Sequence, residues 1–256
     1  MQHVKVHSWS ELQRWLEQYG DGEKQRHFAF RGQADSRWSL RTSLARHFDK
    51  NPIDPHQWRR RELKMYQMFR ERLRQICPRM YDDWSPLDIL SLMQHHEAPT
   101  RLLDFTFCPA VAAYFAVKNT QGNSAIWVVD CDYLEERREK LNLPKYYGPT
   151  HIPEYTKLLE KDYLGGVIVE PTHLHALLAA QRGCFLNTGS ISKPINKELV
   201  HTKVELSEGL AIESCMRLKG MGIDRHGLFP SFRKLAREVN RFSATGGADF
   251  VGGGPA

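Results

Sequence analysis

The stretch LMQHHEAPTRLLDFTFCPAVAAYFAV, residues 92–117, joins a dense polar segment to an apolar run. Two adjacent histidines, a Pro-Thr-Arg, an aspartate and a threonine lie between His95 and Cys108, and the apolar run over residues 110–117 follows at once. This run predicts a helix in the core. Polar groups are costly to bury beside such a helix unless they are paired or hydrogen-bonded. The stretch therefore bears on both fold and function.

Apolar periodicity in the rest of the chain predicts a mixture of helices and strands. Helices are expected over residues 11–19, 56–76, 86–93, 173–180 and 212–218, and strands over 27–32, 124–130, 166–169, 184–186 and 199–206. The charged segment 133–161 is expected to be helical in part. We therefore expect an α+β protein, with a single mixed α/β domain over residues 1–242 that includes an N-terminal helical part. Residues 243–256 are expected to form a disordered tail.

The 256-residue chain has the composition of an ordinary soluble globular protein, with 41% hydrophobic and 26% charged residues. Its formal charge of +6 is compatible with a polyanionic ligand or partner. The five cysteines form neither a CxxC pair nor a zinc spacing, so no disulfide framework is expected. The sequence shows neither a signal peptide nor an apolar run near the ~20 residues of a membrane helix. We expect a cytoplasmic protein that does not bind membranes.

The predicted helix over residues 56–76 has one apolar and one basic face. Such a run of charges is most often a solvated helix face, and the alternative is a surface that binds nucleic acid. The basic positions that would serve this alternative are Arg59, Arg60, Lys64 and Arg70.

The polar segment does not match a metal site or a serine hydrolase. His95 and His96 are sequential, so they point in different directions and lack the i, i+4 spacing of a zinc-binding helix. We predict no bound metal. The chain has no Gly-x-Ser-x-Gly elbow and no carboxylate-rich cradle for a hydrolytic nuclease. In a purely structural alternative, Arg101 and Asp104 form a buried ion pair that holds the loop.

Four blocks of the sequence resemble the FRG domain family, which is named for Phe-Arg-Gly. They are FRGQ at residues 30–33, LMQHHEAPTRLLDFT at 92–106, QRGCF at 181–185 and LFPSF at 228–232. The second block is the most specific. The chain departs from the family at Glu97, where a glycine is usual. This difference affects the expected conformation of the loop, and it adds a carboxylate. The family occurs widely in bacteria and phages.

The order of these blocks is also similar to that of ADP-ribosyltransferases, which implies a split sheet and NAD as a substrate. In those enzymes an Arg or His on an early strand binds the dinucleotide. A strand with Ser or Thr leads into an Ala- and Phe-rich helix, and a Glu or Gln opens a later strand. Arg31, Thr106 and Gln181 fit these three places in order. The resemblance implies that the polar stretch lines an NAD pocket whose floor is the apolar helix.

The chemistry of NAD cleavage suggests which residues bind the phosphates. The reaction passes through an oxocarbenium-like species, and the pyrophosphate needs a cationic clamp. Arg31 or Arg101 is expected to supply this clamp, because a guanidinium offers paired donors to phosphate oxygens. Gly32 is expected to let the phosphates approach the backbone.

Histidines and an aromatic residue are candidates for contacts to the nicotinamide ribose. His95 and His96 can stack on the ribose or hydrogen-bond to it, and we expect one of them to face the pocket and the other the interior. Tyr114 is a candidate to stack on nicotinamide, with the core as the alternative place for its ring.

The catalytic carboxylate is left open. Gln181 cannot accept a proton as a glutamate would, so it is expected to hold a ribose hydroxyl. Glu97, Glu205 and Glu213 are alternatives for the acid/base, and the sequence does not choose between them.

The resulting hypothesis is an NAD-dependent ADP-ribosyltransferase, acting as a toxin or anti-phage effector on a nucleic acid or a protein. A toxin of this kind implies a neutralising antitoxin or a chaperone as a partner. The alternative is a non-catalytic module that binds nucleic acid or a nucleotide through the basic helix.

Overall fold

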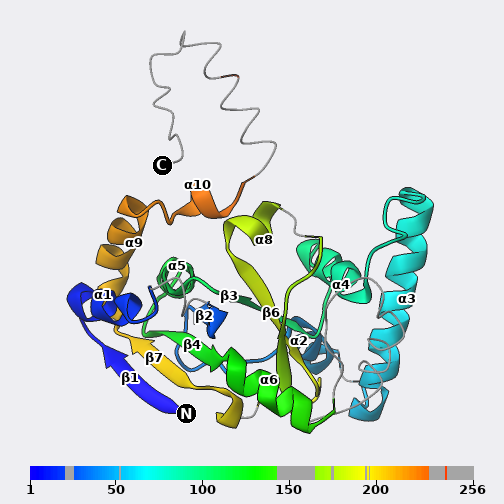
Figure 1. Ribbon diagram of the computed structural model, residues 1–256, viewed down its shortest axis with the longest axis horizontal. Coiled ribbons are helices and arrows are strands. Elements are labelled where there is room, and N and C mark those ends of the chain that lie inside the picture. The colour runs from blue at the N-terminus through cyan, green and yellow to red at the C-terminus, as the bar shows by residue number, and fades with distance from the viewer. Residues whose placement is uncertain are drawn as a thin grey trace.

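A computed structural model describes residues 1–20, 26–51, 53–142, 165–173, 176–193, 195, 197–230 and 240. Across these residues a seven-stranded mixed sheet runs in the order β1-β7-β4-β2-β3-β6-β5, with helices on both faces (Figure 1). The strands are β1 (Gln2–Val6), β2 (Phe28–Gln33), β3 (Leu102–Thr106), β4 (Ser124–Asp130), β5 (Gly166–Val169), β6 (Gly183–Thr188) and β7 (Thr202–Leu206). The pairing of β1 with β7 is parallel, and the other pairings are antiparallel. The expected α+β class is confirmed.

Helices from separate parts of the chain build the two covering layers. The α-helices are α1 (Trp9–Glu17), α2 (Ser43–Lys50), α3 (Trp58–Ile76), α4 (Pro86–His95), α5 (Pro109–Val117), α6 (Cys131–Lys140), α8 (Ala176–Ala180), α9 (Ala211–Gly220) and α10 (Arg225–Leu228). Helices α1, α5 and α9 share a hydrophobic core with β2, β4 and β7. Helix α6 packs on the opposite face of the sheet, and α3 and α4 pack on β5 and β6.

Most predicted elements are present, with shifted ends. The strands expected over residues 124–130 and 166–169 coincide with β4 and β5, and the expected long basic helix is α3, preceded by a 3-10 turn at Pro55–Gln57. Periodicity predicted no element at β1, α2 or β3, all of which are regular structure. The predicted tail over residues 243–256 and the later part of the charged segment 133–161 lie outside the described residues.

The sheet is nearly divided between β2 and β3. Strand β2 pairs with β4 along its whole length, and β3 pairs with β6 along its whole length. Between β2 and β3 themselves, only Phe30 and Thr106 are paired. The two strands therefore part on either side of this contact, in keeping with the expected split sheet.

Helix α5 is apolar on every side because it is enclosed by the fold. Eight of its residues are buried, and it crosses β2 at Gly32. A Cβ atom on Gly32 would lie 2.0 Å from the carbonyl oxygen of Ala112 and 2.5 Å from the backbone nitrogen of Ala116. The missing side chain of Gly32 thus makes room for the backbone of α5. Gly32 also lines the cavity described below, and the approach of ligand phosphates to its backbone stays a prediction.

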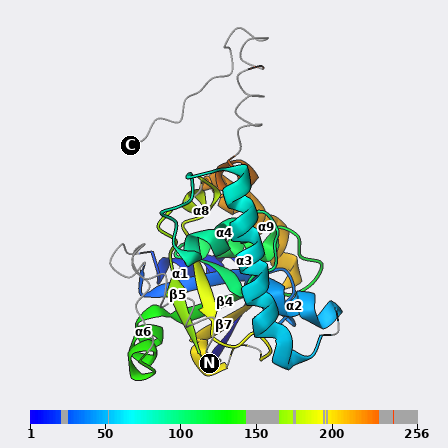
Figure 2. The same ribbon diagram turned by 90° about the vertical axis from the view of Figure 1, so that its right-hand side faces the viewer.

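Helix α3 stands along one outer edge of the molecule, with α2 and α4 beside it (Figure 2). Only Trp58, Glu62 and Tyr66 of this helix are buried. The carboxylate of Glu62 pairs with the guanidinium of Arg101, and the two side chains are 4% and 1% exposed. This buried ion pair ties α3 to the start of β3. The expected buried pair between Arg101 and Asp104 is wrong, because the Asp104 side chain is 67% exposed.

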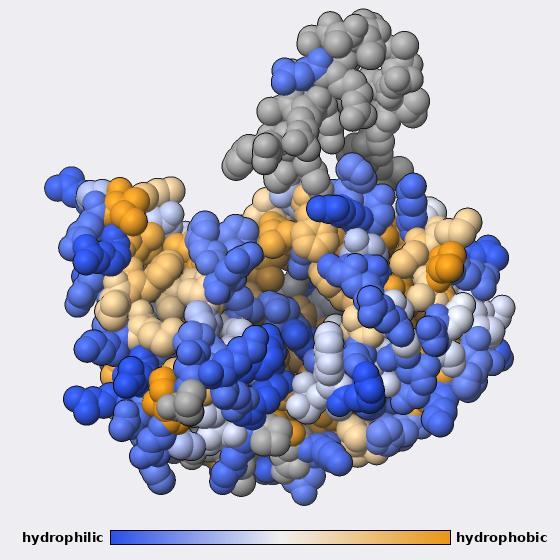
Figure 3. All heavy atoms as spheres, turned by 180° about the vertical axis from the view of Figure 1, so that it is seen from behind, coloured by the Kyte–Doolittle hydropathy of each residue, from blue (hydrophilic) through white to orange (hydrophobic). Residues whose placement is uncertain are grey.

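The surface along α3 is chemically mixed. Figure 3 shows hydrophilic and hydrophobic residues side by side at this edge of the molecule. Arg60 and Lys64 are exposed near the beginning of the helix, whereas Met68 and Ile76 are exposed further along it. Within the described part of the chain, no helix has both the length and the apolar character needed to cross a membrane.

Candidate functional site

A cavity of about 290 Å³ opens where β2 and β3 part. Its size is at the lower end of the roughly 300–1,000 Å³ typical of small-molecule sites. The strands β2 and β3, the helices α5 and α8, and the residues directly after α8 and α10 all contribute to its walls. The lining residues are Phe30, Arg31, Gly32, Asp104, Phe105, Thr106, Ala112, Phe115, Leu177, Gln181 and Phe229. Arg31, Gly32, Thr106 and Gln181, which the sequence analysis selected, therefore meet in one cavity.

Arg31 bridges the gap between the two parting strands. Its Nη1 atom donates to the carbonyl oxygen of Asp104 at 2.7 Å, and the same atom lies 3.6 Å from the Asp104 carboxylate. The Arg31 side chain is only 17% exposed. Burial lowers the pKa of its guanidinium, Asp104 partly opposes this change, and the nearby Arg46 adds to it. An arginine still remains charged under such conditions.

Thr106 and Gln181 hold one another's segments in place. The Thr106 hydroxyl donates to the backbone carbonyl of Gln181 at 2.7 Å and accepts from the backbone nitrogen of Cys108 at 3.0 Å. The side-chain nitrogen of Gln181 donates to the carbonyl oxygen of Leu228 at 3.0 Å. Because the one hydroxyl proton of Thr106 is already used, this residue positions the cavity wall. The amide oxygen of Gln181 accepts no hydrogen bond within the described residues.

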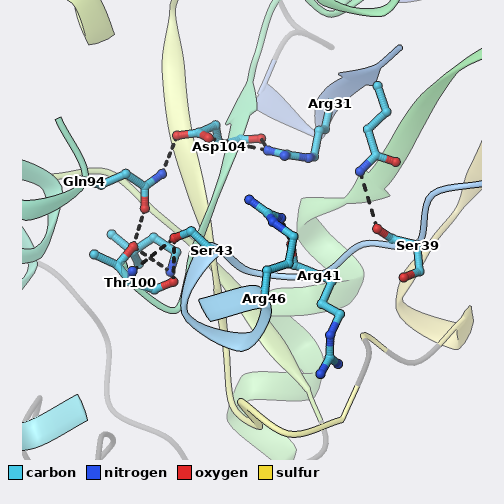
Figure 4. Close-up of polar contacts among 10 residues, drawn as sticks. Arg31, Ser39, Arg41, Ser43, Arg46, Gln94, Thr100 and Asp104 are labelled. Atoms are coloured by element: carbon cyan, nitrogen blue, oxygen red, sulfur yellow. Dashed lines mark hydrogen bonds and ion pairs between the residues drawn. The ribbon is translucent and has the colours of Figure 1, made fainter. Parts of the chain in front are cut away.

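Asp104 belongs to a polar chain that extends from the cavity to α4 (Figure 4). Gln94 donates from its side-chain nitrogen to the Asp104 carboxylate at 2.5 Å. The hydroxyl of Thr100 in turn donates to the side-chain oxygen of Gln94. These bonds fix the amide of Gln94 and orient Asp104 toward the arginine on β2. Gln94, Thr100 and Asp104 of the stretch quoted at the outset thus form one hydrogen-bonded network.

The two histidines lie at the end of α4 and outside the cavity lining. Both side chains are exposed, and their ring centroids are 5.0 Å apart. Partial burial lowers the pKa of His95, and the neighbouring His96 adds to this effect. The expectation that one histidine faces the interior is wrong, because neither is buried. Contact of either ring with a ribose stays a prediction.

Glu97 ends α4 in a left-handed conformation, with φ of 63°. The backbone nitrogen of Ala98 donates to the carbonyl oxygen of Met93, and the nitrogen of Glu97 donates to that of Gln94. This pair of bonds is the Schellman motif, in which the left-handed position favours glycine. The glycine that the resemblance to the FRG family leads us to expect at this position would adopt this conformation without strain. Glu97 is exposed and does not line the cavity.

Two other candidates for ligand contacts lie away from the cavity lining. The guanidinium of Arg101 is buried against Glu62, where it also donates to the carbonyl oxygens of Thr188 and Gly189 at 3.4 and 3.5 Å. Tyr114 is 9% exposed and belongs to the core between α5 and α9. The next residue along α5, Phe115, lines the cavity in its place.

Phe115 forms an aromatic wall together with Phe229, and Lys118 packs against both rings. The ring centroids of the two phenylalanines are 6.0 Å apart, and the Lys118 ammonium lies 4.4 Å and 4.9 Å from them. Burial lowers the pKa of Lys118, and Arg225 contributes to the shift. This wall supplies an apolar surface that suits a flat heterocycle.

Asp104 is the carboxylate that lines the cavity, and the sequence analysis did not select it for catalysis. Of the alternatives, Glu205 accepts from Asn123 and Glu213 pairs with Arg217, and neither lines the cavity. A usable signal was the alternation in LLDFT, which predicts a strand with its aspartate among buried neighbours. Among the described residues, no group of three or more His, Cys, Asp or Glu side chains is arranged to hold a metal ion.

Comparison with known proteins relates part of the chain to a protein family. No curated protein and no solved structure matches the chain. The matching family model, described as the FRG domain, aligns with residues 26–125. This segment contains FRGQ and the polar stretch before α5, and hence Arg31, Asp104 and Thr106 of the cavity. The cavity is therefore built largely by a segment that matches the FRG domain.

Proposed function

We propose that the chain is an NAD-dependent ADP-ribosyltransferase whose reaction takes place in the cavity between β2 and β3. The observation that carries this proposal is the meeting of Arg31, Thr106 and Gln181, three residues more than 70 positions apart along the chain. They follow the order of the corresponding places in ADP-ribosyltransferases. The apolar helix α5 lies beside them, as the NAD pocket of those enzymes requires.

The residues of the cavity suit the steps of the reaction. In the transfer, the bond between the ribose C1′ and the nicotinamide nitrogen breaks, and its electron pair leaves with nicotinamide. The acceptor's nucleophile bonds to C1′ and gives up a proton. The Asp104 carboxylate lies where it can stabilise the developing positive charge or take this proton. The free amide oxygen of Gln181 can accept from a ribose hydroxyl, and Phe115 with Phe229 offers a surface to nicotinamide.

The proposal includes a biological role as a toxin or anti-phage effector in the cytoplasm, with a nucleic acid or a protein as the acceptor. A neutralising partner would then be needed in the producing cell. Growth arrest on induced expression, abolished by the same substitution that abolishes NAD cleavage, would support this role.

The experiment that tests the activity is release of nicotinamide from NAD by the purified full chain. Arg31→Ala is expected to lower the rate of nicotinamide release by roughly a hundredfold or more. Removing one group that stabilises charge in a transition state usually has an effect of this size. Arg31→Lys is expected to recover little, since an ammonium cannot reproduce the paired donors. Arg14→Ala, at an exposed arginine on α1, is the matched control and should retain the wild-type rate.

Arg31 also bridges two strands, so the melting temperature of each variant must accompany the rates. An inactive Arg31→Ala protein that is unfolded at the assay temperature would count only for a structural role. Absence of nicotinamide release by the wild-type chain, together with measurable binding of nucleic acid, would favour the non-catalytic alternative. The exposed Arg60 and Lys64 on α3 are the observation that keeps this alternative in view.

A further inference from the structure

Two arginine side chains approach one another beside the cavity. Figure 4 shows the guanidinium groups of Arg31, on β2, and Arg46, on α2, directed into the same space next to Asp104. Arg46 was not singled out in the sequence and does not line the cavity itself. Its effect on the pKa of Arg31 reflects the repulsion between the two positive charges.

The position of Arg46 is fixed by the docking of α2. Thr42 caps the helix, accepting from the backbone nitrogen of Ala45 at 3.1 Å, and Leu44 and Phe48 are fully buried beneath it. The Nη1 atom of Arg46 donates to the carbonyl oxygen of Arg41 at 2.5 Å. This bond holds one end of the Arg46 guanidinium, while Arg46 as a residue remains exposed.

The negative charge near this pair is smaller than the positive charge. Asp104 is the carboxylate beside Arg31, and one of its oxygens already accepts from Gln94. Arg41, which also lies nearby, is neutralised by Asp49 through bonds of 2.6 and 2.7 Å. Among the described residues, no carboxylate pairs with Arg46. The local excess of positive charge favours an anionic ligand.

Arg31 also has a donor that is not used. Its Nε atom is buried and has no hydrogen-bond partner within the described residues. Buried polar atoms of this kind normally have a partner, and a bound group is one that can supply it. A phosphate oxygen between the two guanidinium groups would do so, because guanidinium and phosphate form paired, charge-assisted bonds.

We propose that Arg31 and Arg46 together bind the pyrophosphate of a nucleotide. The sugar and base attached to one end of this pyrophosphate enter the cavity. The cavity is at the lower end of the size range for small-molecule sites, so a dinucleotide would extend beyond it. Arg31 lines the cavity and is also one of the two arginines, so it joins the two parts of the site. This inference rests on the proposed function and adds Arg46 to it as a binding residue.

The test is a calorimetric titration of the full chain with inorganic pyrophosphate and with ADP-ribose. Arg46→Met is expected to weaken the binding of both by roughly ten- to a hundredfold, the effect of losing hydrogen bonds to a charged group. Arg46→Lys is expected to recover only part of the loss. Arg14→Met is the matched control, because Arg14 is also exposed on a helix and bonded to a backbone carbonyl.

Each outcome decides a separate point. Unchanged binding of both probes by Arg46→Met, or no binding by the wild type, would overturn the assignment. Binding of a single-stranded oligonucleotide that depends on Arg46, without binding of pyrophosphate, would assign the pair to nucleic acid and also overturn it. If pyrophosphate binding depends on Arg46 but nicotinamide is not released from NAD, the inference stands and the proposed transferase activity fails. If wild type and Arg46→Met release nicotinamide with the same KM, the proposed transferase activity stands and the assignment of Arg46 as a binding residue fails.

Discussion

Arg101→Met is predicted to unfold the protein more easily and to leave its ligand contacts intact. Arg101 and Glu62 are almost completely buried, and the Nε and Nη2 atoms of the arginine both donate to the carboxylate. Removing one partner of such a pair leaves an uncompensated buried charge and costs about 3–5 kcal/mol. In a chain of this size each kcal/mol lowers Tm by about 2–4 °C, so a decrease of roughly 6–20 °C is expected.

A double variant separates charge from packing. Because both charges are removed together, Arg101→Met combined with Glu62→Leu should recover part of the stability that Arg101→Met alone loses. The assay is urea and thermal unfolding of the wild type, both single variants and the double variant, with NAD titrated below the melting temperature of each. An Arg101→Met protein that keeps the wild-type Tm but loses NAD affinity would refute this reasoning. It would restore Arg101 as a phosphate ligand.

Two further predictions concern the surface. Glu97→Gly should raise stability by about 1 kcal/mol, measured as a higher Tm, because glycine adopts the left-handed conformation without strain; loss of nicotinamide release in this variant would return Glu97 to the acid/base candidates. Reversing the exposed charges Arg60 and Lys64 to glutamate should make labelling of a nucleic-acid acceptor less dependent on salt, by roughly 0.7–0.9 in the log–log slope for each phosphate that is no longer neutralised. Parallel curves for wild type and variant would show that α3 is only a solvated surface.

The local elements were predictable because their signals lie within a few residues. Ser85, Pro86 and Asp88 form a capping box with proline in the first turn, which starts α4 from sequence alone. The apolar run after Pro109 can only be a buried element, and the compact apolar runs of β4 and β5 coincide with strands. In these cases the pattern and the burial it requires are properties of one short segment.

The orientation of α5, and hence which of its side chains point toward the cavity, was not predictable in the same way. A helix that is apolar all round carries no stripe to show which residues point at a given neighbour. The sequence analysis therefore selected Tyr114, whereas the docking of α5 against Gly32 places Phe115 at the cavity.

What the sequence by itself determined is the class of fold, the main helices and the blocks that carry the family resemblance. Only the tertiary structure decided which polar groups meet. Arg31 reaches Asp104 across 73 positions, Arg101 reaches Glu62 across 39, and Thr106 reaches the carbonyl of Gln181 across 75. Such contacts follow from strand order and from helix docking, which sum many weak preferences over the whole chain. The polar residues before α5 accordingly divide between the cavity, a helix end and a buried ion pair.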